Sequence, residues 1–129
     1  MKDFKKYYTI TASPEEVYLA LTNPLSIQLW SGAPAEMSTE VDSEFFLFEG
    51  DISGRNLEFV EGKKIVQQWY FDGQDEESIV TIKLHEHKKG TSAELIHTNI
   101  PDEVYDEFVD GWNDSYFGEL IEFFEDDEL

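Results

Sequence analysis

The sequence contains no cysteine, which excludes disulfide bonds and thiolate chemistry. It also has no run of about 18 apolar residues, so no segment is suited to cross a membrane as a helix. Residues 1–13 include basic side chains but no apolar block typical of a secretory signal. We therefore expect a cytoplasmic protein.

Proline and glycine are sparse, with 4 and 8 residues, and no stretch rich in them divides the chain. No internal repeat is present either. A chain of 129 residues is most simply one domain, residues 1–129, that buries roughly two-thirds of its unfolded surface. With 10 Phe, 6 Tyr and 3 Trp, its core is expected to be rich in aromatic side chains.

Basic residues are scarce as well: 9 Lys and Arg against 29 Asp and Glu give a formal net charge of −20. Binding to nucleic acids or anionic membranes depends on clustered Lys and Arg, so the sequence argues against both partners. The acidic residues are interleaved with aromatic ones, which argues against wholesale disorder. The simplest interpretation is a solubility surface; adaptation to a salty cell and a basic protein partner are the alternatives.

The segment from Asp102 to about Glu125 predicts a long helix with an aromatic face. Its apolar residues follow steps of three, four and one, as on one stripe of a helix with period 3.6. At ~1.5 Å per residue the helix is on the order of 35 Å long and needs a concave apolar surface to pack against. Acidic residues crowd its negative end, so residues 125–129 are predicted to form a frayed acidic tail. The stripe comprises Val104, Tyr105, Phe108, Val109, Trp112, Tyr116, Phe117, Leu120, Ile121 and Phe124.

The residues before this helix predict strands and two short helices. Ser13 is a natural N-cap, Pro14 suits the first helical position and Glu16 can complete a capping box. A second short helix is expected from Leu25 to Trp30. Strands are predicted at 4–11, 44–48, 52–60, 65–71 and 78–86, with a last one through 93–97 and a less regular one at 35–39. The fold class is therefore α+β: a curved antiparallel sheet of about six strands wrapped around a long C-terminal helix.

Four segments resemble a known family in the right order: residues 13–22 (SPEEVYLALT), residues 52–59 with 65–69 (ISGRNLEF and IVQQW), residues 93–97 (AELIH), and Gly111-Trp112. The family is the activator of heat shock protein 90 ATPase homologue, C-terminal-like, within the START or birch-pollen-allergen-like (SRPBCC) superfamily. The resemblance covers essentially the whole chain and implies the helix-grip fold. Members of the superfamily include co-chaperone domains, binders of lipids or polyketides, and aromatases and cyclases.

The candidate site is the space between the helix and the sheet. Gly111 and Gly118 interrupt the helix, and each leaves room or allows close approach to the sheet. Periodicity alone favours a core that fills itself, and the resemblance raises a cavity for a small apolar or aromatic ligand to an equal alternative. The candidate ligand-binding residues are Phe46, Phe48, Leu57, Trp69, His97, Phe108, Trp112 and Tyr116.

No catalytic set, cofactor or metal site is predicted. His97 is in phase with buried positions, where it is either a hydrogen-bonded structural residue or an acid–base group, and no second catalytic partner is fixed by spacing. His85 and His87 share one face of a strand, but no third metal ligand is indicated.

The sequence thus favours a ligand-binding protein over an enzyme. A chaperone-interacting regulator is the first alternative, although the family's co-chaperones carry a separate N-terminal domain that has no counterpart before Met1. A cyclase or aromatase-like enzyme acting through His97 is the second. A monomer is expected, or a weak homodimer formed through an exposed Trp30 and residues 45–48.

Overall fold

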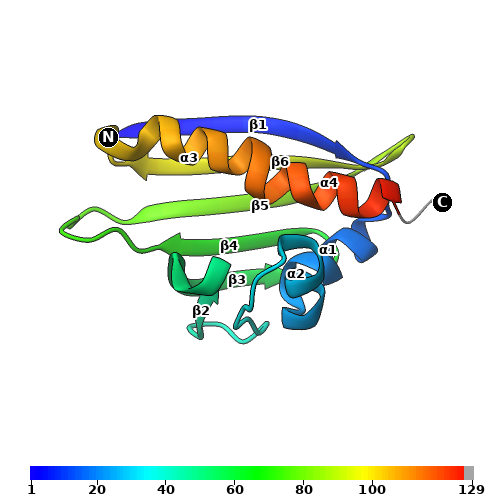
Figure 1. Ribbon diagram of the computed structural model, residues 1–129, viewed down its shortest axis with the longest axis horizontal. Helices are drawn as coiled ribbons and strands as arrows, with labels where there is room; N and C mark the ends of the chain where they lie inside the picture. Colours follow the sequence, from blue (N-terminus) through cyan, green and yellow to red (C-terminus); the bar gives the residue numbers. More distant parts are fainter. Residues whose placement is uncertain (127–129) are drawn as a thin grey trace.

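The computed structural model describes residues 1–126, with side chains to Glu125, as one sheet crossed by a long helix (Figure 1). The elements in chain order are β1 (Lys2–Ile10), α1 (Pro14–Thr22), α2 (Pro24–Ser31), β2 (Glu44–Leu47), η1 (Phe48–Gly50), β3 (Ile52–Val60), β4 (Lys64–Trp69), β5 (Ser78–His87), β6 (Gly90–Ile100), η2 (Asp102–Val104), α3 (Tyr105–Gly111), η3 (Trp112–Tyr116) and α4 (Phe117–Asp126).

The six strands form a single antiparallel sheet in the order β1-β6-β5-β4-β3-β2. The five strands from β2 to β6 follow one another as antiparallel neighbours, and β1 forms the other edge by pairing with β6. In Figure 1, the helical run from α3 to α4 lies diagonally across one face, with α1 and α2 at the end of the sheet beside α4. The predicted α+β helix-grip architecture is confirmed.

The two short helices begin where the sequence predicts. The Ser13 side chain accepts a hydrogen bond from the Glu16 amide, and the Glu16 carboxylate reaches back, which completes the capping box. Asn23 ends α1 and caps α2 by accepting from the amides of Leu25 and Ser26. Gly32 ends α2 with φ 77°, a left-handed conformation that glycine adopts without strain. These local signals fix α1 and α2 against the end of the sheet.

The long C-terminal helix contains a π-helical turn, η3, that the apolar pattern did not predict. The Phe117 amide donates to the Trp112 carbonyl, a step of five residues. The added residue lets the neighbours Tyr116 and Phe117 both face the sheet, at 5% and 0% exposure. Gly118 is required behind this turn, since a Cβ there would lie 2.4 Å from the Asn113 carbonyl oxygen.

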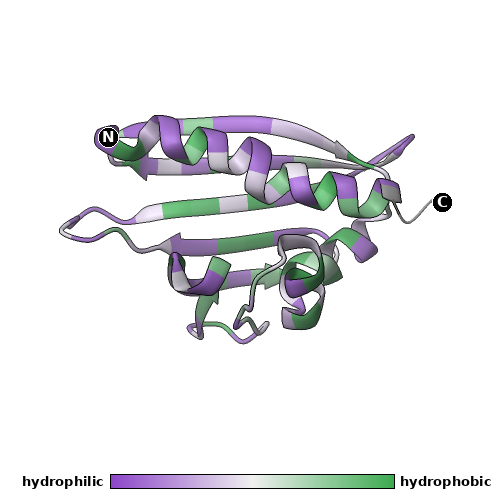
Figure 2. Cartoon of the chain, viewed as in Figure 1, coloured by the Kyte–Doolittle hydropathy of each residue, from purple (hydrophilic) through white to green (hydrophobic). Residues whose placement is uncertain are grey.

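The core lies between this helix and the concave face of the sheet. Side chains that alternate along the strands meet the apolar stripe of the helix, and Figure 2 shows hydrophobic and hydrophilic residues alternating along α3 and α4. Fully burying one such side chain stabilises the fold by roughly 1.5–3 kcal/mol. The largest buried members include Ile10, Phe45, Leu47, Ile65, Ile82, Leu95, Trp112, Phe117 and Leu120.

Two expectations about local structure are wrong, and a third lies partly outside the described residues. The strand predicted at 35–39 is reduced to one isolated bridge between Glu36 and Phe46. Trp30 is only 4% exposed and its indole N–H donates to the Ala20 carbonyl, so it offers no dimer surface. Of the predicted frayed tail at 125–129, the first two residues still belong to α4, and the rest lies outside the described residues.

Within residues 1–126, no helix has the length and apolar character needed to span a bilayer.

Candidate functional site

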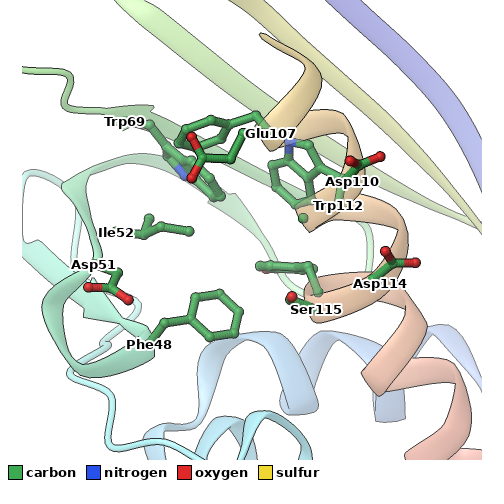
Figure 3. Close-up of a pocket in the computed structure, with 12 residues that line it drawn as sticks. Phe48, Asp51, Ile52, Trp69, Glu107, Asp110, Trp112, Asp114 and Ser115 are labelled. Atoms are coloured by element: carbon green, nitrogen blue, oxygen red, sulfur yellow. The ribbon is translucent and has the colours of Figure 1, made fainter. Parts of the chain in front are cut away.

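An open cavity of about 720 Å³ lies between the turn that joins β2 to β3 and the C-terminal helix (Figure 3). The turn contributes one wall, β4 contributes part of the floor, and α3 with η3 contributes the opposite wall. The lining residues are Phe48, Asp51, Ile52, Trp69, Glu107, Phe108, Asp110, Gly111, Trp112, Asp114, Ser115 and Tyr116.

The floor of the cavity is a continuous aromatic surface. Trp69 and Trp112 stack with ring centroids 4.7 Å apart, and Tyr116 lies 4.6 Å from Trp112. Phe108 meets Trp69 edge-on at 6.2 Å, and Phe48 meets Tyr116 at 6.4 Å. Such offset and edge-to-face pairs are favourable geometries for aromatic rings. The cavity therefore offers ring faces and edges for an apolar or aromatic group.

Trp69 is held in place by a chain of buried amides. Its indole N–H donates to Gln67 Oε1 at 3.1 Å, and Gln67 Nε2 donates to Asn56 Oδ1 at 3.0 Å. Asn56 in turn donates to the Ser38 carbonyl and the Ser43 hydroxyl. A buried polar group without a hydrogen-bond partner destabilises the fold. Rotating the Trp69 ring would leave such groups unpaired, so this network fixes the orientation of the ring.

Trp112 is held in the same way by His97 on β6. The Trp112 indole N–H donates to His97 Nδ1 at 3.0 Å, and Ser78 Oγ lies 2.9 Å from His97 Nε2. The Ser78 hydroxyl donates its proton to the Thr98 carbonyl. An indole nitrogen can only donate, so Nδ1 is the acceptor, and Nε2 carries the proton and donates to Ser78. His97 is therefore a neutral imidazole with both nitrogens engaged.

The His97 ring is unsuited to acid–base chemistry in the cavity. It is fully buried, and this burial lowers its pKa to about 3. It lies behind the two tryptophans and does not line the cavity. The geometry therefore supports the structural alternative for His97.

The turn η1 brings a strained backbone to the edge of the cavity. Phe48 and Glu49 have φ values of 53° and 58°, in the left-handed region that residues other than glycine rarely adopt. Because of this conformation, β2 ends at Leu47, one residue before the end of the strand predicted at 44–48. Phe48 instead lines the cavity, where its ring lies edge-on to Trp30 and Tyr116. Strained backbone of this kind often persists where surrounding contacts hold a functional geometry.

Gly111 leaves the middle of the helical wall open. It lies in ordinary helical geometry, and a Cβ added there would meet nothing within 4 Å. The helix therefore does not need glycine at this position for its backbone. A larger side chain would project into free space beside Trp112.

Carboxylates surround the opening. In Figure 3, Asp51 and Glu107 direct their carboxylates over the opening from opposite sides, while Asp110 and Asp114 lie further out along the helix. None of the four takes part in an ion pair or hydrogen bond through its side chain within the described residues. The opening is therefore negatively charged above an apolar floor.

The structure places five of the eight predicted site residues along the cavity: Phe48, Trp69, Phe108, Trp112 and Tyr116. Phe46 is 41% exposed because Phe45, its neighbour on β2, takes the inward position. Leu57 lies at a β-bulge, where the register between β3 and β4 shifts, and is carried away from the cavity. The strand pattern alone could not show either effect.

The sequence pattern missed the polar residues of the opening, although it singled out Gly111. Asp51 follows the Phe48–Gly50 turn, and Glu107, Asp110, Asp114 and Ser115 lie one or two residues from the apolar stripe. Their only signal was their spacing from Phe108 and Trp112. On a helix, residues three or four positions apart share a face, which could have identified Glu107 with Gly111 and Ser115.

The other histidines belong to the outer face and the end of the sheet. His85 Nε2 lies 2.8 Å from Glu94 Oε1, and Lys5 lies 3.5 Å from the same carboxylate. The hydrogen bond from His85 lowers the pKa of Glu94. His87 Nδ1 accepts a hydrogen bond from the Lys89 amide.

Comparison with known proteins shows the family to which the chain is similar. The model of the family described as Activator of Hsp90 ATPase homolog 1-like protein matches residues 11–125. The human activator of 90 kDa heat shock protein ATPase homolog 1 is 31% identical over 111 residues, which is 84% of this chain and 33% of the human protein. An uncharacterized protein from Schizosaccharomyces pombe is 36% identical over 67 residues, 52% of this chain and 20% of that protein. The chain thus spans a fifth to a third of the length of these curated relatives.

Solved structures agree with the fold over nearly the whole chain. The crystal structure of an HSP90 activator from Plasmodium falciparum superposes with a TM-score of 0.83 at 26% identity and covers 92% of both chains.

Proposed function

The chain belongs to the Activator of Hsp90 ATPase homolog 1-like family, and from this premise we propose that its domain binds a small apolar or aromatic molecule in the cavity between η1 and the C-terminal helix. The observation that carries the proposal is the unfilled cavity of about 720 Å³ above a floor of Trp69, Trp112 and Tyr116. Its volume lies within the roughly 300–1,000 Å³ typical of small-molecule sites.

The rigidity of the floor supports binding. Trp69 is held by Gln67 and Trp112 by His97, so neither ring has to be ordered when a ligand arrives. Immobilising a side chain with many rotamers on binding costs roughly 0.5–1.5 kcal/mol. A floor that is already ordered avoids this loss, and the affinity of an apolar ligand rises accordingly.

The same geometry favours binding over catalysis. His97 is neutral and buried behind the tryptophans, which removes the acid–base group that a cyclase or aromatase role would use. The carboxylates of the lining residues lie at the solvent-exposed opening rather than against the aromatic floor.

The proposal is tested by titrating the protein with N-phenyl-1-naphthylamine, a neutral apolar fluorophore, and by filling the cavity. Gly111→Leu places an isobutyl group in the open space beside Trp112 without backbone strain. Asp106→Leu is the matched control, because it adds the same side chain to an exposed position of α3 that does not line the cavity. We expect wild type and Asp106→Leu to bind the probe equally, and Gly111→Leu to bind it at least about tenfold more weakly. Equal binding by all three proteins would overturn the proposal.

A second candidate function, regulation of the 90-kDa chaperone, is favoured by the names of the relatives. The human relative and the Plasmodium falciparum structure are both described as activators of that chaperone. The test adds the domain to the purified chaperone and measures binding and the ATPase rate. A rise in the rate that survives Gly111→Leu would assign the chaperone role to a surface other than the cavity.

A further inference from the structure

We propose that the cavity selects a cationic ligand: a protonated amine or a quaternary ammonium group attached to an apolar or aromatic body. This inference rests on the proposed ligand-binding function and specifies the charge of the ligand. It is carried by unpaired carboxylates around an opening that is lined by the half-buried rings of Phe48 and Phe108, together with a Tyr116 hydroxyl that has no partner within the described residues.

The carboxylates come from two elements that are far apart in the sequence. Asp51 follows the strained turn η1, and Glu107 lies on α3, so the fold brings the two acidic groups to opposite sides of one opening (Figure 3). Both side chains are exposed, and within the described residues neither forms an ion pair or hydrogen bond. Asp110 and Asp114 add negative charge along the helix. An ammonium group at the opening would be attracted from both sides.

Basic residues are excluded from this region. All 9 Lys and Arg lie between residues 2 and 89, and none of them lines the cavity. Two other hollows of the surface contain basic residues: one is lined by Lys88 and Lys89, another by Lys63, Lys64 and Lys83. A further hollow, lined by Glu15 and Glu61, contains none. No basic side chain interrupts the negative charge at this opening. This charge would repel a carboxylate or phosphate ligand.

The aromatic floor suits a cation as well as an apolar group. A ring face carries negative charge density and attracts an ammonium ion, more strongly where water is excluded. Trp69, Trp112 and Tyr116 are buried, so the ring surface that a ligand can reach comes mainly from the half-buried side chains of Phe48 and Phe108. A quaternary ammonium group has no N–H and cannot donate a hydrogen bond. Ring faces and carboxylates can bind it without one.

The Tyr116 hydroxyl supplies the third element. Tyr116 is only 5% exposed and lines the cavity, yet no group in the described part of the chain hydrogen-bonds to its hydroxyl. The hydroxyl oxygen is not among the fully buried, unpaired polar atoms of the described residues, so solvent reaches it and a ligand in the cavity can pair with it. The oxygen can accept from a protonated amine, and the hydroxyl remains neutral because burial raises the pKa of Tyr116.

The test compares three ligands that share one aromatic body: 2-naphthylmethyl-trimethylammonium, its neutral analogue 2-neopentylnaphthalene, and the anion 2-naphthylacetate. Each is titrated into the protein at low and at high salt while tryptophan fluorescence is recorded. We expect the cation to bind about tenfold more tightly than the neutral analogue, the anion to bind most weakly, and the preference for the cation to shrink at high salt.

Two double variants separate the local carboxylates from the overall charge. Asp51→Asn with Glu107→Gln removes two charges at the opening, and Glu119→Gln with Glu122→Gln removes two from exposed helical positions that do not line the cavity. We expect the first variant to lose the preference for the cation while keeping its affinity for the neutral analogue, and the second to behave like wild type.

The outcomes distinguish the two proposals. If the neutral analogue binds and the cation binds no better, the inference about charge fails while the proposed ligand-binding function stands. Equal loss of cation binding in both double variants would show attraction to the net charge alone and would also overturn the inference. If no ligand binds, both proposals fail.

Discussion

Trp69 and Trp112 stack with their ring centroids 4.7 Å apart and their planes 24° apart, and each indole N–H donates to a different buried side chain of the sheet. Gln67 accepts from Trp69, and His97 accepts from Trp112. The stack thus joins the C-terminal helix to β4 and β6 at the floor of the cavity. Stability and ligand binding therefore depend on the same contacts.

The neutral state of His97 makes the free energy of unfolding depend on pH. Burial lowers the His97 pKa from 6.5 to about 3, so below pH 6.5 the unfolded chain takes up a proton that the folded chain does not. This contribution is complete above pH 6.5 and is lost as the pH falls toward 3. Wild type should lose about 1.4 kcal/mol per pH unit in that window relative to His97→Asn, which keeps an acceptor for Trp112 but does not titrate. Urea unfolding of both proteins between pH 7 and 4.5 measures it; parallel curves would contradict the assignment.

Replacing Gln67 by leucine should destabilise the protein by about 2–3 kcal/mol. The change removes the acceptor of the Trp69 indole and the donor to Asn56, and leaves buried polar groups unpaired. Gln68→Leu, at the neighbouring position on the opposite face of β4, should change the unfolding free energy by no more than about 0.5 kcal/mol. Denaturant unfolding gives both values, and near-ultraviolet circular dichroism reports the tryptophan stack. An equal, small effect of the two substitutions would show that the amide chain does not hold Trp69.

The two helical glycines should respond in opposite directions to alanine. Gly111→Ala adds a methyl group in open space and should stabilise the helix by up to about 1 kcal/mol. Gly118→Ala forces a Cβ to within 2.4 Å of the Asn113 carbonyl oxygen and should destabilise the protein by about 1–3 kcal/mol. Thermal unfolding of both variants gives the comparison. A stabilising Gly118→Ala would argue against the π-helical turn.

The strain at η1 predicts a stabilising substitution. Glu49 is exposed and has φ 58°, which is unfavourable by roughly 1–2 kcal/mol for residues other than glycine. Glu49→Gly should therefore stabilise the fold by about 0.5–1 kcal/mol after the greater freedom of glycine in the unfolded chain is included. Asp51→Gly, at φ −62°, has no such strain to relieve and should destabilise it. Chemical denaturation of the two variants provides the check, and destabilisation by both would contradict the strain.

Much of the fold could be predicted from the sequence because its signals are local. Ser13, Pro14 and Glu16 mark the first helix by capping chemistry alone, and alternation along residues 78–86 follows from one buried sheet face. The aromatic residues of the floor were found because Phe108, Trp112 and Tyr116 recur every four residues. These patterns do not depend on which other element covers them.

The features that the sequence did not predict depend on tertiary contacts. An inserted π turn leaves few traces in the sequence: the adjacent pair Tyr116 and Phe117, both buried, and the glycine that follows them. The bulge that displaces Leu57 and the left-handed backbone at Phe48 are fixed by pairing between strands. The state of His97 follows from Trp112 and Ser78, which meet it only in the folded chain.

Native mass spectrometry of the purified protein tests the central claim, ligand binding in the aromatic cavity, most directly. Wild type and Gly111→Leu are prepared side by side from the same cells, and small molecules released on activation are identified. The account predicts an apolar or aromatic molecule bound one to one in wild type and lost from Gly111→Leu. Equal retention by both proteins, or none by either, would contradict it.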